Sequence, residues 1–416
     1  MYRVWYSTES FADFIIDHTM LSGVPTTKKK MFESDANNPT RFHTMPDHIR
    51  KILYLDAPDL IVEKDNEPVF SIEVTTEAGT GHNAFQRFAR IAAAVENSVP
   101  AFYIYPEGKI ITRKAAPTKW DELNPLIFRA LESVMSVYNI PALLYYFPSD
   151  DIPMYRDQPD LAPHIADKGL CFDADIIKYS GCPDSTALSM QNMFSAINEI
   201  VNSTETLGVI PGRARLLGNI VIRNQRTFMQ DQFAAKAAGR HAEEMSPLSA
   251  VQEIPTRYLL NYLSQYETDG YALGELLRSR NTTAIYQVNA GFRGDPYPGC
   301  LSAIDYLTCR EGLTFEDRRK NLVMVWGNVE IDHENETLHI VNQHNSTIQD
   351  FFSAVKSCAR MNLLTKDYDD LNNSEIPRYF MQVRYGSTYS KVKHIRVYSY
   401  FADALLFPDG SLWRDA

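Results

Sequence analysis

Hydrophobic and polar positions follow two different periods in the first 150 residues. Residues 60–62 form a short apolar run, a polar turn follows at 63–68, and residues 69–75 then alternate with a period of two. Two such runs joined by a short polar turn predict a β-hairpin. Residues 82–97 instead repeat apolar side chains every three or four positions, which predicts a helix.

Further elements surround this hairpin. The same patterns predict short helices at 13–20 and 47–55, strands at 101–105 and 142–147, and a helix at 125–138. The order is therefore helix, hairpin, helix, strand, helix, strand. Such an order is typical of an α/β fold in which helices flank a mixed sheet.

A proline-rich segment at 147–164 marks a predicted domain boundary. Its prolines lie among acidic residues, at Pro148, Pro153, Pro159 and Pro163. Prolines at this density interrupt helices and strands alike. We therefore expect one domain at 1–150 and a larger α+β region at 151–416.

The larger region has weaker patterns. It is expected to be helical from about 186 to 282, with strands at 322–326 and 338–341 and a helix at 351–361. A sub-boundary near residue 285 is an alternative division. DNA recognition and dimerisation are the two roles considered for this region.

Composition excludes several classes of protein. Apolar residues make up 44% of the chain and aromatic residues 12%, which indicates a packed globular protein. No apolar run is long enough to span a bilayer and no signal peptide is recognisable, so we expect a cytoplasmic protein without a membrane partner. The five cysteines form no CxxC pair, which argues against a zinc site. The net charge of −11 argues against a non-specific binder of nucleic acid.

Two acidic residues of the hairpin form the candidate catalytic site. Asp59 lies at the start of the first strand and Glu73 near the end of the second, so both can reach the same edge of the sheet. Mg²⁺ prefers oxygen ligands, usually one or two carboxylates with water, and the carbonyl of Val74 is a further candidate ligand. The pattern predicts a Mg²⁺ site for phosphodiester cleavage. The alternative is a hairpin with solvated acidic ends.

Residues 50–147 resemble the PD-(D/E)XK nuclease superfamily, which has the restriction-endonuclease-like fold. The resemblance rests on Pro58 and Asp59, on the run Glu73-Val74-Thr75, and on the order of the elements around them. It implies that the aspartate and the glutamate bind Mg²⁺. It also implies a lysine two residues after the glutamate, where this chain has Thr75.

The missing lysine leaves a positive charge to be supplied from elsewhere. A second metal ion is one source, and three lysines are the other candidates: Lys51, Lys64 and Lys109. Thr75 is expected to orient the attacking water or the scissile phosphate. It would do so with Gln86, because a polar residue of the following helix often supports the site in this family.

The helix after the hairpin carries a polar stripe. Asn83, Gln86, Arg87 and Arg90 recur at helical spacing, so these side chains can face the two carboxylates. Arg87 is also a candidate contact to DNA.

A basic segment at 376–400 is a second candidate for DNA binding. It holds tyrosines and basic residues but no acid, and the residues expected to bind DNA are Arg384, Lys391, Lys393 and Arg396. A hairpin with a basic outer face is the alternative. Weaker candidates are the acid-poor stretch 212–230 and a helix–turn–helix at 256–281, for which a solvated face and packed core helices are the alternatives.

These observations together predict a Mg²⁺-dependent type II restriction endonuclease that cuts double-stranded DNA. A homodimer is expected because a twofold pair of sites can cut both strands. No motif for nucleotide-driven or serine-hydrolase chemistry is present. Two alternatives stay open: another defence or repair nuclease with a C-terminal sensor region, and a decayed nuclease fold that only binds DNA.

Overall fold

The computed structural model describes a large part of the chain, in two compact units. The described residues are 1–31, 45–53, 57–75, 87–106, 108–113, 116–122, 126–147, 178–237, 251–265, 277–288, 320–326, 328–341, 403–406, 410 and 412–413. The first unit comprises residues 1–33, 46–53 and 58–243, and the second comprises 34–45, 54–57 and 244–416.

The strands of the first unit form a six-stranded mixed sheet. In spatial order they are β2 (Thr26–Lys30), β1 (Tyr2–Tyr6), β3 (Leu60–Lys64), β4 (Glu67–Val74), β5 (Ala101–Pro106) and β8 (Ala142–Phe147). Strands β1, β3 and β4 are antiparallel to one another in turn, whereas β5 and β8 continue parallel to β4. Strand β2 pairs parallel to β1. The predicted α/β class with a mixed sheet is confirmed.

The predicted hairpin is the pair β3–β4. Asp65 and Asn66 form its two-residue turn, with φ angles of 53° and 65°. Aspartate and asparagine tolerate positive φ better than most residues, and a turn with positive φ at both positions matches the twist of the strands. The apolar side chains Phe70 and Ile72 of β4 are fully buried. Asp65 and Asn66 set the turn, and the alternation places Phe70 and Ile72 on one face of β4. The other face, with Ser71 and Glu73, is buried too.

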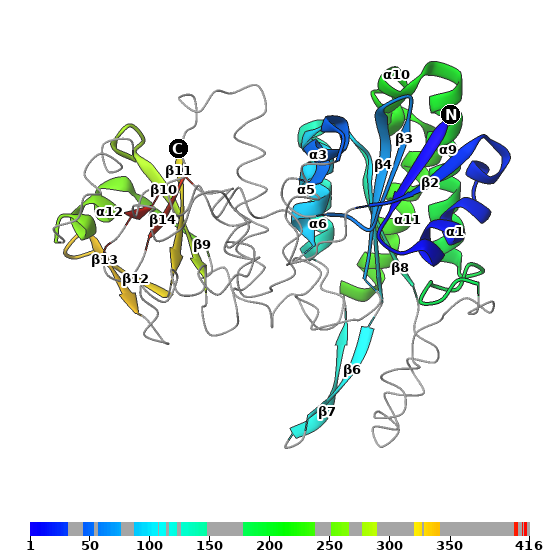
Figure 1. The fold of residues 1–416 in the computed structure, drawn as a ribbon. Helices are drawn as coiled ribbons and strands as arrows, with labels where there is room; N and C mark the ends of the chain where they lie inside the picture. The colour runs from blue at the N-terminus through cyan, green and yellow to red at the C-terminus, as the bar shows by residue number, and fades with distance from the viewer. Residues whose placement is uncertain are drawn as a thin grey trace, which may run out of the picture. The chain divides into compact units, whose positions relative to one another are not determined.

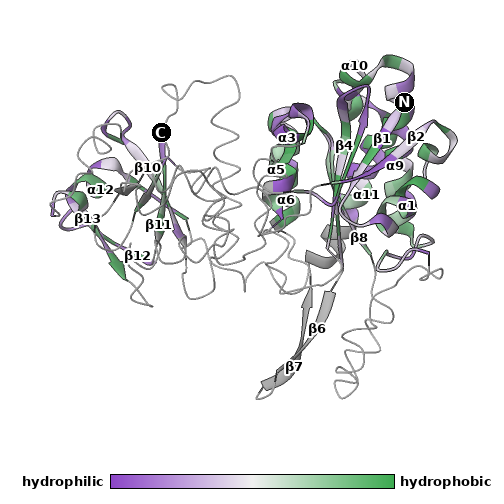
Figure 2. Ribbon diagram, in the orientation of Figure 1, coloured by the Kyte–Doolittle hydropathy of each residue, from purple (hydrophilic) through white to green (hydrophobic). Residues whose placement is uncertain are grey.

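Helices cover both faces of this sheet (Figure 1). One face carries α3 (Asp47–Leu53), α5 (Phe88–Glu96) and α6 (Leu126–Tyr138). The other carries α1 (Glu9–Asp17), η1 (Met20–Gly23), α9 (Leu188–Leu207), α10 (Val209–Arg213), η3 (Leu216–Gly218) and α11 (Ile220–Ala237). Helices α5 and α6 carry both hydrophobic and hydrophilic residues, as expected of helices that bury one side (Figure 2). None of the helices in the described part of the chain combines the length and hydropathy required to span a bilayer.

The first unit extends past the predicted boundary near residue 150. Lys64 of β3 donates to Glu205 of α9 at 2.9 Å, and the Tyr145 hydroxyl of β8 donates to Gln225 of α11 at 3.4 Å. Helices from beyond residue 178 therefore form the second helical layer of the first sheet. The difference has a physical reason: a sheet with parallel strands is buried on both faces, and the segment before residue 150 supplies helices mainly to one of them.

The acid-poor stretch 212–230 belongs to this layer too. Arg213 is buried, and its guanidinium donates to the carbonyl oxygen of Pro68 at 2.9 Å and lies 3.5 Å from Glu67. Arg226 donates from Nε to Glu132 of α6 at 3.0 Å. These two arginines hold helices and strand together, so their role differs from the one considered for a DNA backbone.

Four strands of the first unit were not predicted. Two of them are β1 and β2, and the other two form a separate hairpin, β6 (Gly108–Arg113) with β7 (Ala116–Glu122). Strand β1 is buried on both faces and has no simple alternation of apolar and polar residues. Strand β2 reads Thr-Thr-Lys-Lys-Lys and lies at the edge, so its sequence carries no hydrophobic signal.

The second unit contains a smaller mixed sheet. Its order is β15 (Leu412–Trp413), β14 (Ala404–Leu406), β11 (Lys320–Trp326), β10 (Thr282–Val288) and β9 (Val251–Pro255). Helix α12 (Thr256–Leu263) and the hairpin β12 (Asn328–Asp332) with β13 (Thr337–Val341) share its hydrophobic core. The strands predicted at 322–326 and 338–341 are present as β11 and β13.

Two predictions for the second region are wrong. The helical stretch expected up to residue 282 is interrupted by strand β9, and the sub-boundary near 285 falls inside β10, where Ile285 is fully buried. In addition Arg280, placed at the end of a helix–turn–helix, is buried and donates to Asn321 Oδ1 at 3.0 Å. A buried polar network with Thr256 and Thr283 occupies this place, and most of the second helix of that motif lies outside the described residues.

Candidate active site

The two predicted catalytic acids meet at one end of the first sheet. Leu60 of β3 pairs with Ile72 of β4, so the next step of the same antiparallel register sets Asp59 opposite Glu73. Side chains that face each other in this way have Cβ atoms about 5 Å apart. The geometric expectation from the hairpin, that both acids reach one edge, agrees with this register.

Asp59 is held in place by its neighbours on both sides. Its Oδ1 accepts a hydrogen bond from the hydroxyl of Ser7 at 3.0 Å, and its Oδ2 accepts one from the backbone N–H of Val74 at 3.0 Å. The backbone N–H of Ser7 also donates to the carbonyl oxygen of Asp59 at 2.9 Å. The carboxylate is therefore fixed between the ends of β1 and β4, while its side chain keeps 25% of its surface exposed.

Glu73 is buried and surrounded by arginines of the following helix. Its side chain is 1% exposed, its Oε2 accepts a hydrogen bond from Nη1 of Arg90, and its Oε1 lies 3.5 Å from Nε of Arg87. The same Nη1 atom lies 3.9 Å from Oδ2 of Asp59. Arg87 and Arg90, the two described members of the predicted polar stripe, therefore face the carboxylates, and among the described residues Arg90 is the group that both acids share.

Burial dominates the electrostatics of Glu73. The pKa of Glu73 is raised to about 8 in total: burial raises it most, Arg90 lowers it, the charge of Asp59 raises it and Arg87 lowers it. The carboxyl group therefore binds a proton readily when no other cation is present. A metal ion at this place would have to displace that proton, so ion binding is linked to pH.

The raised pKa predicts a pH-dependent stability. Glu73 keeps its proton in the folded protein up to about pH 8, whereas the unfolded chain releases it near pH 4.5. Between these values the folded state binds more protons, so its contribution to the free energy of unfolding decreases as pH rises, by at most about 1.4 kcal/mol per pH unit. Urea unfolding across this range should show a steeper loss in the wild type than in Glu73→Gln. Equal slopes in the two proteins would contradict the expectation.

Thr75 and Tyr103 complete the row of side chains next to Glu73. Tyr103 of β5 pairs with Glu73 in the parallel register, and Thr75 lies two residues further along on the same face. Burial raises the pKa of Tyr103, as do Tyr105 and Glu73, while Arg87 and Thr75 lower it. The phenol therefore stays protonated and can act as a hydrogen-bond donor. The hydroxyl oxygen of Thr75 is buried.

The oxygen atoms gathered here suit Mg²⁺. The N–H of Thr75 donates to the carbonyl oxygen of Ile104 in β5. The N–H and C=O of Val74 therefore point the opposite way, toward β3, and this N–H donates to Asp59. The carbonyl of Val74 is therefore on the Asp59 side of the strand. Two carboxylates and a carbonyl, completed by water, form a donor set that Mg²⁺ accepts. No third acidic, histidine or cysteine side chain joins them among the described residues.

The lysines considered for the missing positive charge lie elsewhere. Lys51 is 4.0 Å from Glu67, and Lys64 pairs with Glu205. Glu67 and Lys64 flank the turn of the hairpin, and six residues of strand, or about 20 Å, separate Glu67 from Glu73. The side chain of Lys109 lies outside the described residues. Within the described chain the cations that reach Glu73 are arginines, Arg87 and Arg90.

Several predicted site residues are not placed by the structure. Gln86 and the predicted DNA-binding residues Arg384, Lys391, Lys393 and Arg396 lie outside the described residues. Arg87, also predicted to contact DNA, points its Nε toward Glu73 and leaves a third of its side-chain surface exposed. It could therefore reach a phosphate only with the part of its guanidinium that Glu73 does not use.

Ser7 and Tyr103 are members of the site that the sequence did not indicate. Both were missed because nothing in the local pattern connects them to Asp59 or Glu73. Ser7 directly follows β1, and the aromatic and β-branched content of Tyr2–Tyr6 is the signal that could have located that strand. Tyr103 lies in a strand that was predicted, but the pairing of that strand with β4, which sets Tyr103 beside Glu73, was not.

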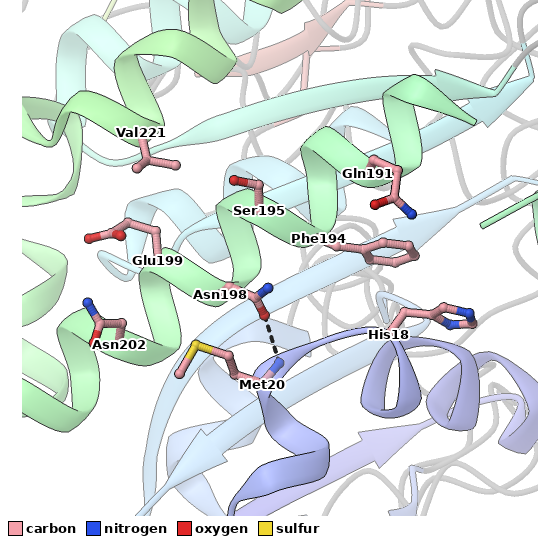
Figure 3. Close-up of a pocket in the computed structure, with 9 residues that line it drawn as sticks. All are labelled: His18, Met20, Gln191, Phe194, Ser195, Asn198, Glu199, Asn202 and Val221. Carbon is pink, nitrogen blue, oxygen red and sulfur yellow. Dashed lines mark hydrogen bonds between the residues drawn. The ribbon is translucent and has the colours of Figure 1, made fainter. Parts of the chain in front are cut away.

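A cavity of about 400 Å³ lies elsewhere in the first unit (Figure 3). His18, Met20, Val221 and a row of side chains on α9 line it: Gln191, Phe194, Ser195, Asn198, Glu199 and Asn202. The carboxylate of Glu199 accepts a hydrogen bond from Asn219 at 2.6 Å, and Asn198 accepts one from the N–H of Met20 at 2.7 Å. With one acid and no lysine or arginine among its described lining, this cavity is not suited to hold a metal–phosphate pair.

Comparisons of the chain with protein-family models, with curated proteins and with solved structures find no match. A function for this chain is therefore inferred from the geometry around Asp59 and Glu73.

Proposed function

We propose that this chain is a Mg²⁺-dependent endonuclease that cuts double-stranded DNA. One observation carries the proposal: the carboxylates of Asp59 and Glu73 come from adjacent antiparallel strands and converge on a single cation, Nη1 of Arg90. Such convergence concentrates negative charge where a divalent ion can neutralise it. An ordinary hairpin with solvated acidic ends would leave Glu73 exposed, whereas its side chain is 1% exposed.

The arrangement of elements supports the likeness to PD-(D/E)XK nucleases. The hairpin β3–β4 leads through α5 to β5, which pairs parallel to β4 next to Glu73. This is the order of elements on which the resemblance rests. We propose on these grounds that the first unit has the restriction-endonuclease-like fold. The finer proposal is a type II restriction enzyme acting as a homodimer.

Each residue of the site has a proposed role in the reaction. Asp59, Glu73 and the carbonyl of Val74 would hold Mg²⁺. When bound, the ion makes a coordinated water more acidic and neutralises charge on the phosphate. Ser7 keeps the Asp59 carboxylate in a single orientation through its hydrogen bond to Oδ1. Thr75 would position the water or phosphate without supplying charge, and Arg87 would offer its exposed edge to the phosphate.

A cleavage assay tests the proposal. The purified chain is incubated with plasmid and phage DNA above pH 8, where Glu73 is ionised, with Mg²⁺ or with EDTA. Discrete fragments that require Mg²⁺ are expected from a restriction enzyme. A smear or single nicks would favour another defence or repair nuclease. A gel shift without cutting, in DNA that contains many sequence contexts, would contradict the nuclease proposal.

A second candidate function follows from Arg90. If this arginine is a permanent partner of the two acids, the chain is a nuclease fold that has lost its metal and binds DNA only. The absence of the motif lysine at Thr75 favours the same reading. Measuring Mn²⁺ binding by the chain without DNA separates the two candidates, because a permanent Arg90 bridge leaves no affinity for the ion.

A further inference from the structure

Arg90 lies where the two acids of the candidate site converge. Its Nη1 atom donates to Oε2 of Glu73 and is 3.9 Å from Oδ2 of Asp59. Arg87 faces the other oxygen of Glu73, with 3.5 Å between Nε and Oε1. Both oxygens of Glu73 therefore face arginines, but only Arg90 is shared with Asp59.

The acids are fixed in position, whereas Arg90 reaches them on a longer side chain with more rotatable bonds. Asp59 is held by Ser7 and by the backbone of Val74, and Glu73 is buried on a central strand. Arg90 extends from α5 on a long side chain and keeps 11% of its surface exposed. Such a side chain can turn its charged end toward water while its stem stays packed. If an ion enters this site, we therefore expect Arg90 to move and the two carboxylates to stay in place.

A divalent ion and Arg90 require the same atoms. Mg²⁺ bound to Asp59 and Glu73 would contact the oxygens that face Nη1 of Arg90. Two cations this close repel each other strongly, since the surroundings of Glu73 are largely free of water. The site therefore admits the ion or the guanidinium, and not both in this arrangement.

We propose that Arg90 is an internal competitor of the metal ion. Its guanidinium donates to Glu73 and offsets the charge of Asp59 while no divalent ion is bound, and it leaves both acids when an ion binds. The inference rests on the proposed function for the identity of the ion, Mg²⁺. Arg90 is then a positioning residue. It pairs with the two acids when no metal ion is bound, and it sets the concentration of ion at which the site is filled.

Titration of the full-length chain with Mn²⁺ in the absence of DNA tests this role. Arg90→Gln removes the charge, and it should bind Mn²⁺ about tenfold more tightly than the wild type or better. Arg90→Lys keeps the charge and should bind no more tightly than the wild type. Arg3→Gln is the matched control, because Arg3 pairs with a different buried acid, Glu63, at 2.7 Å and has no contact with Asp59 or Glu73 in the described structure; the affinity of this variant should differ from that of the wild type by less than about threefold.

Thermal unfolding gives a second readout. Without its cation the buried acid pair is destabilising, so Arg90→Gln should melt at a lower temperature than the wild type. Saturating Mn²⁺ should then raise the melting temperature of this variant by more than it raises that of the wild type. The double variant Glu73→Gln/Arg90→Gln should lose the gain in affinity.

Four results are possible, two on each side. Tighter Mn²⁺ binding by Arg90→Gln, or a variant that folds only when Mn²⁺ is present, supports the proposal. Equal or weaker binding overturns it, and so does a variant that stays unfolded with and without Mn²⁺, because Arg90 would then be purely structural.

Failure of the nuclease proposal would look different. If Arg90→Gln binds Mn²⁺ tightly and neither protein cuts DNA, the competitor role stands and the proposed function falls. If the wild type cuts DNA with Mg²⁺ and Arg90→Gln binds ions no more tightly, only the role of Arg90 falls.

Discussion

Replacing Glu73 with glutamine is expected to lower Mg²⁺-dependent DNA cleavage by on the order of 10³-fold or more, because the proposed nuclease would lose a metal ligand and with it several kcal/mol of charge stabilisation in the transition state. Glutamine has nearly the same shape and can still accept the hydrogen bond from Arg90. The fold should therefore persist. The rate of conversion of supercoiled plasmid by wild type and variant measures the effect.

Glu63→Gln is the matched control for this experiment. Glu63 of β3 is also buried, with 3% of its side chain exposed, and it pairs with Arg3 at 2.7 Å and with His48. It is an acid of equal burial that does not contact Arg90 or Asp59 in the described structure. Cleavage should be retained in this variant. An equal loss in both variants would mean that cleavage depends on the stability of buried ion pairs and not on a metal at Glu73.

Ending the chain at residue 150 is expected to abolish folding, whereas a chain ending at residue 243 should fold. The shorter chain lacks α9 and α11, which cover one face of the first sheet. That face includes fully buried aromatic residues: Phe70, Phe102, Tyr145 and Phe147. Exposing four such side chains costs roughly 6–12 kcal/mol, which is comparable with the entire stability of an ordinary domain.

Solubility and cooperative urea unfolding of the two fragments check this expectation. The longer fragment supplies the control, since it differs only in the segment that contains the second helical layer. A soluble fragment of 150 residues that unfolds cooperatively would show that the sheet does not need this layer. It would support the domain boundary predicted near residue 150.

The local sequence pattern was sufficient to predict the elements around Asp59 and Glu73. The alternation of 69–75 and the polar residues Asp65 and Asn66 lead to the hairpin, because side chains of a strand point to alternate faces and the turn needs positive φ. Helices α5 and α6 follow from their 3.6-residue period. The approximate meeting of Asp59 and Glu73 follows from the hairpin alone.

Local pattern was insufficient wherever pairing with a distant segment decides the structure. The lysines of β2 look like a solvated loop, and only the backbone of β1 makes them a strand. Arg213 and Arg280 look like surface charges, yet each is buried against acceptors from another element. Lys51 and Lys64 were candidates to replace the missing lysine of the motif. In the tertiary structure both lie at the turn of the hairpin, at the end opposite to Asp59 and Glu73.

The sequence by itself therefore determined the α/β class, the hairpin and the pair of acids, because these depend on contacts between residues close in the chain. Only the tertiary structure decided where the first unit ends and which residues surround the acids. Ser7, Tyr103 and Arg90 come from three separate elements, and the register of the sheet and the packing of α5 bring them to Asp59 and Glu73. Long-range packing sets these neighbours, and with them the charge and burial on which any chemistry at the site depends.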